Sequence, residues 1–137
     1  MATRTDGAAV IQRLFELTDA GDVAGLRALV HDDLEAFWPQ SGERLIGPDN
    51  AIAAQMATEV KPVPAGEPRI VGEGDTWVMM LPLRYGEDVY HYVGVFELRD
   101  GLIHRTTEYF GAPFPPQAML LFKRFHLQRA EFVSWCS

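Results

Sequence analysis

The stretch GVFELRDGLIHRTTEYF, residues 94–110, decides the fold of this chain. At its centre, Asp100-Gly101 is a strong signal for a β-hairpin, because both turn residues tolerate a positive φ. The flanking segments are rich in apolar residues and predict the two strands of that hairpin. Side chains on the second strand alternate between two faces, so Thr106, Glu108 and Phe110 share one of them. Glu108 is therefore a candidate chemical group if that face lines a cavity, and has no functional meaning if it faces water.

Length and charge limit the classes of protein that fit. A chain of 137 residues, 47% of them hydrophobic, suits one folded domain with a substantial core. The formal net charge of -7 argues against nucleic acid, whose phosphates need clustered Lys and Arg, and against an anionic membrane surface. No apolar run approaches the ~20 residues of a membrane span, and residues 1–9 lack the apolar core of a signal peptide. We therefore expect a cytoplasmic protein without nucleic-acid or membrane partners.

Sequence motifs for metals and cofactors are absent. The single cysteine, Cys136, has no partner for an internal disulfide, and no two histidines have the helical or strand spacing of a metal site. The sequence contains no GxSxG, no P-loop and no dinucleotide fingerprint. We therefore expect neither a metal nor a cofactor.

Hydrophobic periodicity and turn residues place helices before strands. Three helices are expected, one after a Thr5 or Asp6 cap, one after an Asp22 cap and closed by Asp32-Asp33, and one opening at Pro48. Residues 61–68, rich in Pro, predict a linker. This order is typical of an α+β fold, in which helices cover the concave side of a curved antiparallel sheet and leave a cavity between the layers. The predicted strands are residues 34–38, 69–73, 76–85, 89–99 and 102–110.

Several short motifs, individually weak, follow one another at consistent spacing. They are LTDAGD at 17–22, HDD at 31–33, WPQSGER at 38–44, FELRDGLI at 96–103 and TEYF at 107–110. In this order they resemble the nuclear transport factor 2-like superfamily, in particular its SnoaL-like branch, over about residues 8–115. The resemblance implies a cone-shaped α+β barrel with three N-terminal helices on a strongly curved antiparallel sheet. It also implies a pocket inside the cone and, usually, a homodimer.

The C-terminal segment departs from this family pattern. We expect the cone domain to occupy residues 1–116 and residues 117–137 to form an atypical extension, both apolar and basic. Such a segment is too apolar to stay in water unaided. Packing on its own cone, capping the pocket and crossing to a partner subunit are all open.

The superfamily does not imply one activity, because it includes ketosteroid isomerases, polyketide cyclases, dehydratases, epoxide hydrolases and non-catalytic binders. Ketosteroid isomerase needs an Asp base, and a Tyr and a protonated Asp that stabilise an oxyanion. Alignment of the motifs puts these three roles on Trp38, Leu14 and Gly94, none of which can perform them. We therefore expect no double-bond migration in a steroid enone, followed by absorbance against a heat-killed control; measurable migration would overturn the alignment.

The register implied by the resemblance turns one face of each strand inward, and that face is almost entirely apolar. Glu108 is its only carboxylate and the candidate acid or base, with Tyr92 as a candidate donor. The alternative is a carboxylate that holds the cone together through a Tyr, an Arg or a backbone amide. In either case we expect Glu108 to be mostly buried and hydrogen-bonded. The candidate pocket residues are Leu14, Trp38, Gln40, Met56, Trp77, Met79, Leu81, Tyr90, Phe96, Thr106 and Phe110, although core packing is the commoner role of such aromatics.

Three functions remain open at this point. The first is a cofactor-independent isomerase, cyclase or dehydratase that acts on a small apolar or aromatic metabolite, and an open pocket with Glu108 unpaired favours it. The second is a non-catalytic binder of such a molecule, favoured by an open pocket with Glu108 locked to Arg or Tyr. The third is a dimerisation domain whose cavity is filled by its own side chains. A homodimer is expected through the outer sheet face, where Val93, Val95 and Arg105 lie.

Overall fold

The computed structural model describes residues 6–115, so the predicted extension at 117–137 lies outside the described residues. Helices precede most strands, as expected for an α+β chain. The elements are α1 (Gly7–Ala20), α2 (Val23–Leu29), β1 (Val30–Trp38), β2 (Glu43–Ile46), α3 (Pro48–Met56), β3 (Val63–Pro64), β4 (Arg69–Glu73), β5 (Thr76–Tyr85), β6 (Asp88–Arg99) and β7 (Leu102–Gly111).

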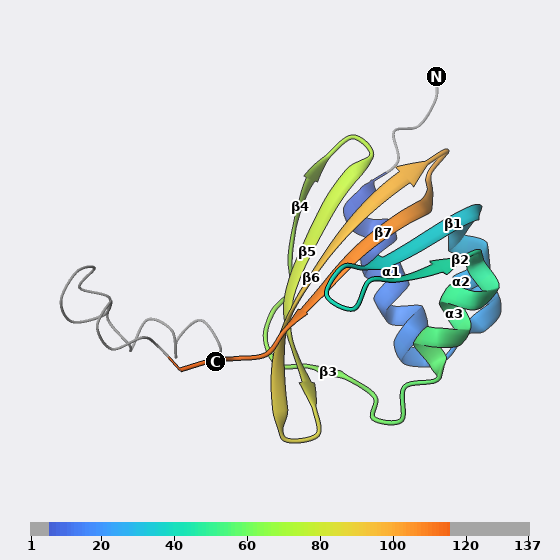
Figure 1. Ribbon diagram of the computed structural model, residues 1–137. Coiled ribbons are helices and arrows are strands. Elements are labelled where there is room, and N and C mark those ends of the chain that lie inside the picture. The colour runs from blue at the N-terminus through green and yellow to red at the C-terminus, as the bar shows by residue number, and fades with distance from the viewer. Residues whose placement is uncertain (1–5, 116–137) are drawn as a thin grey trace.

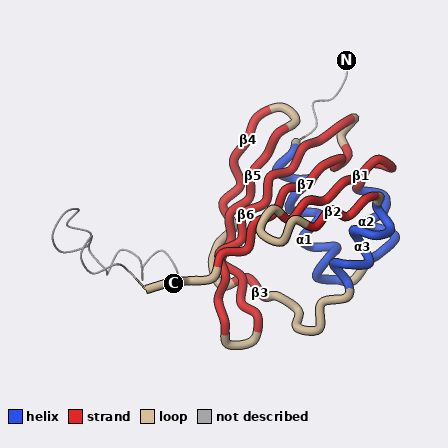
Figure 2. Tube along the Cα trace, in the orientation of Figure 1, coloured by secondary structure: helices blue, strands red, loops and turns tan. Residues whose placement is uncertain are grey.

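All three helices pack on one side of a single twisted sheet, as Figures 1 and 2 show. Local signals set the helix ends. The Asp6 side chain accepts hydrogen bonds from the first-turn N–H groups of α1, and Gly21, with φ 67°, ends that helix. Asp22 caps α2 in the same way, and Pro48 opens α3. The α+β cone of three helices on a sheet is thereby confirmed.

The sheet differs from the expectation in two details. Its order is β2-β1-β7-β6-β5-β3, with β4 also paired to β5. Strands β1 and β7 run parallel, whereas every other pairing is antiparallel. Hairpins give antiparallel neighbours, but β1 and β7 are far apart in the chain and meet through a crossover. The described sheet is also not closed into a barrel, because β2 lies at one edge and β3 and β4 lie at the other.

The predicted hairpin between β6 and β7 is confirmed, with φ of 53° at Asp100 and 77° at Gly101. A β-bulge follows, since Leu98 pairs with Ile103 but Glu97 pairs with Arg105. The extra residue lets both Ile103 and Thr106 face the helices, although an odd number of positions separates them. The bulge therefore aligns Thr106 and Glu108 with the buried core.

The turn glycine gives a direct test of this hairpin. Replacing Gly101 by Ala forces a Cβ into the left-handed region, so we expect a loss of about 1–2 kcal/mol in the free energy of unfolding. Gly111→Ala is the matched control, because Gly111 has no positive φ and its new Cβ would make an ordinary contact at 3.5 Å. Chemical denaturation of both variants measures the difference, and equal stabilities would contradict the turn geometry.

Two predicted boundaries were wrong near the first strand. β1 begins at Val30 rather than at residue 34, so Asp32-Asp33 lies in the strand and does not close a helix. Its pairing with β7 is irregular between Val30 and Glu35, which leaves both aspartates exposed. The predicted linker at 61–68 contains the short strand β3, and β2 was not predicted at all, because both are too brief for a periodic signal.

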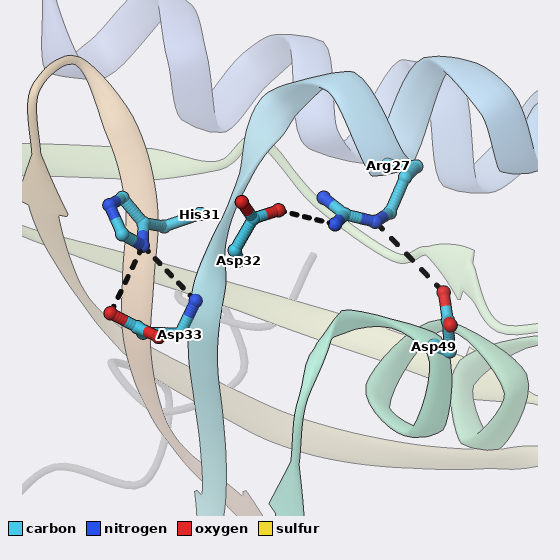
Figure 3. Close-up of polar contacts among 5 residues, drawn as sticks. All are labelled: Arg27, His31, Asp32, Asp33 and Asp49. Carbon is cyan, nitrogen blue, oxygen red and sulfur yellow. Dashed lines mark hydrogen bonds and ion pairs between the residues drawn. The ribbon is translucent and has the colours of Figure 1, made fainter.

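The exposed aspartates belong to a group of surface ion pairs at the α2–β1 junction, drawn in Figure 3. Arg27 lies between Asp32 (N–O distance 2.5 Å) and Asp49 (3.9 Å), so it links α2 to β1 and α3. The Arg27 guanidinium lowers the pKa of Asp32. Exposed pairs of this kind contribute little to stability, and we assign them no further role.

Candidate functional site

A small cavity lies between the helices and the sheet. Its volume is about 80 Å³, and its walls come from α1, α2, α3, β1, β2, β6 and β7. The walls are apolar except for Thr18, Gln55, Thr106 and Glu108. We call this space the inner cavity. Glu108 is the only ionisable side chain among the described residues that line it.

The Glu108 carboxyl group is held by two donors from neighbouring strands. The Tyr92 hydroxyl of β6 donates to Oε2 at 2.7 Å, and the Trp38 indole N–H of β1 donates to Oε1 at 3.3 Å. Burial raises the pKa of Glu108 above its ordinary value, and the surrounding donors oppose this rise without cancelling it. Glu108 is partly buried rather than fully enclosed, and the expected hydrogen bond to a Tyr hydroxyl is present.

Gly94 provides the space that this pair needs. It lies directly opposite Glu108 in the register of β6 and β7. A Cβ at Gly94 would lie 2.3 Å from the Tyr92 hydroxyl, so any side chain there would displace it. Burial also raises the pKa of Tyr92 well above its ordinary value, which keeps the hydroxyl protonated as a donor. The position aligned with the isomerase's second Asp thus leaves room for the Tyr92–Glu108 hydrogen bond.

Thr106 adds a polar group to the same wall, two residues before Glu108 on β7. Its side chain is 7% exposed, and its hydroxyl makes no hydrogen bond within the described part of the chain. The hydroxyl is close enough to favour the charged form of Glu108, although it lacks good hydrogen-bond geometry. Buried hydroxyls are usually hydrogen-bonded, so this one is available to a water or a ligand.

A larger cavity of about 430 Å³ lies beside the first, and we call it the outer cavity. Trp38 and Gln55 line both cavities and therefore form their boundary. Three aromatic rings, those of Trp38, Tyr85 and Phe110, face the outer cavity, together with uncharged polar residues near its rim.

Gln40 lies at this rim, but its amide is occupied by the protein backbone. It donates to the Phe110 carbonyl at 2.8 Å and accepts from the Phe110 N–H at 2.6 Å. These two bonds fasten the loop after β1 to the end of β7. We expect Gln40→Ala to lower the free energy of unfolding by about 1–2 kcal/mol. Gln55→Ala, which removes an amide with no such bonds, is the control in denaturation experiments. Equal losses of stability in the two variants would mean that the Gln40–Phe110 bonds do not stabilise the fold.

The structure brings together some of the sequence-predicted residues and separates others. Leu14, Trp38, Phe96, Thr106 and Glu108 line the inner cavity, and Gln40 and Phe110 line the outer one. The remaining predicted residues line neither: Tyr92, Met79 and Leu81 lie in the core, Met56 packs against it, Trp77 bonds to the Gly74 carbonyl, and Tyr90 contacts the Tyr85 ring.

Sequence reasoning did not single out Tyr85 or the apolar residues of α2 and α3 that line the inner cavity. Tyr85 ends the predicted strand 76–85 on the same face as Leu81 and Leu83, so strand alternation carried a signal for it. Leu26 and Ile52 contribute to the apolar periodicity that predicts helices, but that pattern did not indicate that they line a cavity. Among the described residues, no group of His, Cys, Asp and Glu could hold a metal ion, and no helix is long and apolar enough to cross a membrane.

Solved structures of similar fold support this architecture. An NTF-2-like protein of unknown function from Burkholderia xenovorans LB400 is 29% identical, with a TM-score of 0.73, and the match covers 89% of this chain and 93% of that one. A putative ketosteroid isomerase from Kribbella flavida DSM 17836 is 20% identical, with a TM-score of 0.75 and coverage of 88% and 86%. An LEH-like epoxide hydrolase of M. tuberculosis is 21% identical, with a TM-score of 0.62 and coverage of 74% and 80%.

These likenesses concern the fold, and their different activities do not choose among functions. No curated protein sequence matches the chain. The family of SnoaL-like domains, however, matches residues 11–106, which is most of the chain. That span contains most of α1, all of α2 and α3, the hairpin turn and Thr106, and ends just before Glu108. The chain therefore belongs to the family of SnoaL-like domains.

Proposed function

We propose that this protein binds a small, mainly apolar molecule in its cone, with Glu108 as the polar anchor. The observation that carries the proposal is a partly buried carboxyl group, fixed by Tyr92 and Trp38, on the wall of a mainly apolar cavity. A carboxyl group locked to Tyr is the arrangement that favours a binder over an enzyme among the functions considered from sequence.

The anchor retains capacity for a ligand. A carboxylate offers about four acceptor sites, of which Tyr92 and Trp38 occupy two. The Thr106 hydroxyl beside it has no hydrogen bond in the described chain. Because Glu108 is partly removed from water, a hydrogen-bond donor on the ligand would replace a hydrogen bond that water would otherwise supply.

Native mass spectrometry of the gently purified full chain tests this proposal by identifying a co-purified molecule. We expect Thr106→Val to weaken its binding with little loss of stability, because the Thr106 hydroxyl makes no hydrogen bond within residues 6–115. Thr107→Val, on the opposite face of β7, is the control and should bind normally. A ligand that binds Thr106→Val and Glu108→Leu as tightly as the unaltered protein would overturn the anchor.

A second candidate is a cofactor-independent isomerase, cyclase or dehydratase, and one observation favours it. Burial raises the pKa of Glu108, and a carboxyl group with a raised pKa holds its proton more readily and is suited to exchange it with a substrate. Once a ligand is identified, chromatography of the mixture distinguishes the two functions. If the unaltered protein converts the ligand, and Glu108→Gln still binds it but no longer converts it, the protein is an enzyme and not a non-catalytic binder.

We also propose that the protein acts in the cytoplasm as a homodimer through the outer sheet face. Val93 and Val95 alternate with the buried Tyr92 and Phe96, so they point away from the helices. Tyr109, opposite Val93 in the register, is 41% exposed. Sedimentation of the full chain should give twice the single-chain mass, and Val95→Lys should reduce it. A single-chain mass at high micromolar concentration would contradict the dimer.

A further inference from the structure

The two cavities differ in size in a way that limits how a ligand can bind. The inner cavity, at about 80 Å³, is much the smaller of the two. The outer cavity, at about 430 Å³, lies in the usual range of sites for drug-sized molecules. The inner cavity therefore accepts only a small group, and the bulk of any larger ligand must lie outside the Trp38–Gln55 boundary.

The chemistry of the outer cavity favours an apolar, planar body. No charged side chain lines it among the described residues. Three of its polar side chains are already bonded to backbone: Gln40 bonds to Phe110, the Ser41 hydroxyl donates to the Trp38 carbonyl, and the Thr58 hydroxyl donates to the Gln55 carbonyl. The Gln55 amide and the Tyr85 hydroxyl are its other polar groups. The rings of Trp38, Tyr85 and Phe110 remain as the main contact surfaces, and aromatic faces bind planar groups well.

The chemistry of the inner cavity favours a small donor. Glu108 presents acceptor sites there, and the Thr106 hydroxyl next to it is without a hydrogen bond in the described chain. A single hydroxyl group can donate to Glu108 and accept from Thr106 at once. Apolar side chains surround both groups, which leaves little that could stabilise a larger polar substituent.

We propose that the ligand binds in two parts, with a small hydroxyl-bearing end in the inner cavity at Glu108 and a planar apolar body in the outer cavity. This inference rests on the proposed function, because it needs Glu108 as the anchor. Trp38 then sets the division, since it lines both cavities and its indole N–H also holds Glu108.

Two alanines of α3 offer a matched test. Ala51 lines only the inner cavity and Ala54 only the outer one, so leucine at either position fills one space and leaves the other unchanged. Two probes are titrated into the full chain and followed by NMR: propanol, which fits the inner cavity, and phenylbutanol, which carries an aromatic ring on a flexible tether. Thermal unfolding confirms that each variant is folded, and Ala51→Val replaces Ala51→Leu if the latter is not.

We expect phenylbutanol to bind both variants about tenfold or more weakly, because a methylene-sized change in an apolar pocket already has effects of that order. Propanol should lose affinity only in Ala51→Leu. Unchanged phenylbutanol binding in Ala54→Leu would place the whole molecule inside the cone and overturn the two-part mode. Unchanged binding in the Ala51 variant would place it wholly outside, with the same consequence.

The same titrations separate this inference from the proposed function. If either alcohol shifts the signals of Glu108 and Thr106, the anchor holds and only the division between cavities is in question. If neither alcohol shifts them, and Glu108→Leu changes the binding of neither probe, the anchor itself is wrong and both proposals fall together.

Discussion

Phe96→Ala is expected to lower the free energy of unfolding by about 3–5 kcal/mol, the usual cost of truncating a buried aromatic side chain. Phe96 is 1% exposed and belongs to the cluster of buried hydrophobic residues that forms the core. It also lines the inner cavity, so the truncation merges the space left by the ring with an existing void. The surrounding side chains therefore cannot easily move in to fill the new space, so we expect a loss of stability toward the upper end of this range.

Denaturant unfolding measures this loss, with Phe114→Ala as the control. Phe114 is 84% exposed, and its truncation should change stability by no more than about 0.5 kcal/mol. A loss of less than about 1 kcal/mol for Phe96→Ala would mean that the ring does not sit in a packed core, in which case the walls assigned to the inner cavity would also be wrong.

Local signals explain how much of the fold could be predicted. The Asp100-Gly101 turn, the Asp6 and Asp22 caps and Pro48 at the start of α3 each act within a few residues, and each lies where expected. The strand at 76–85 was predicted with its observed bounds because its apolar alternation is long. Parallel pairing of β1 with β7 could not be predicted from alternation, because it depends on contacts between distant segments.

The candidate site was predictable to the extent that strand alternation determines it. Alternation placed Thr106 and Glu108 on one face, and the resemblance turned that face inward. The division into two cavities was not predictable, because it depends on Trp38 of β1 and Gln55 of α3, two residues distant in sequence that line both cavities. The two hydrogen bonds between the Gln40 side chain and the Phe110 backbone were not predictable either. A polar loop residue carries no pattern that indicates which distant backbone groups it will bind.

The second large effect concerns Glu108, where two neutral substitutions isolate its structural role. Glu108→Leu should be less stable than Glu108→Gln by about 1–3 kcal/mol, because leucine leaves the Tyr92 hydroxyl buried without an acceptor. Tyr92 is 3% exposed, so water cannot replace the lost partner easily. Both variants lack the charge, and the cost of burying it therefore cancels in the comparison. Equal stabilities in denaturation would mean that the Tyr92–Glu108 bond does not anchor the cone.

The unaltered protein should show a pH dependence that Glu108→Gln lacks. Because burial raises the pKa of Glu108 in the folded state above its ordinary value near 4.5, the folded chain holds this proton more tightly than the unfolded chain. The contribution to stability is thus fully present below the unfolded pKa and is lost as pH rises through the folded pKa. The stability difference between the unaltered protein and Glu108→Gln should therefore fall with increasing pH across that window. A difference that grows with pH there would mean that the Tyr92 and Trp38 donors outweigh desolvation, and that Glu108 is a carboxylate held charged rather than one poised to accept a proton.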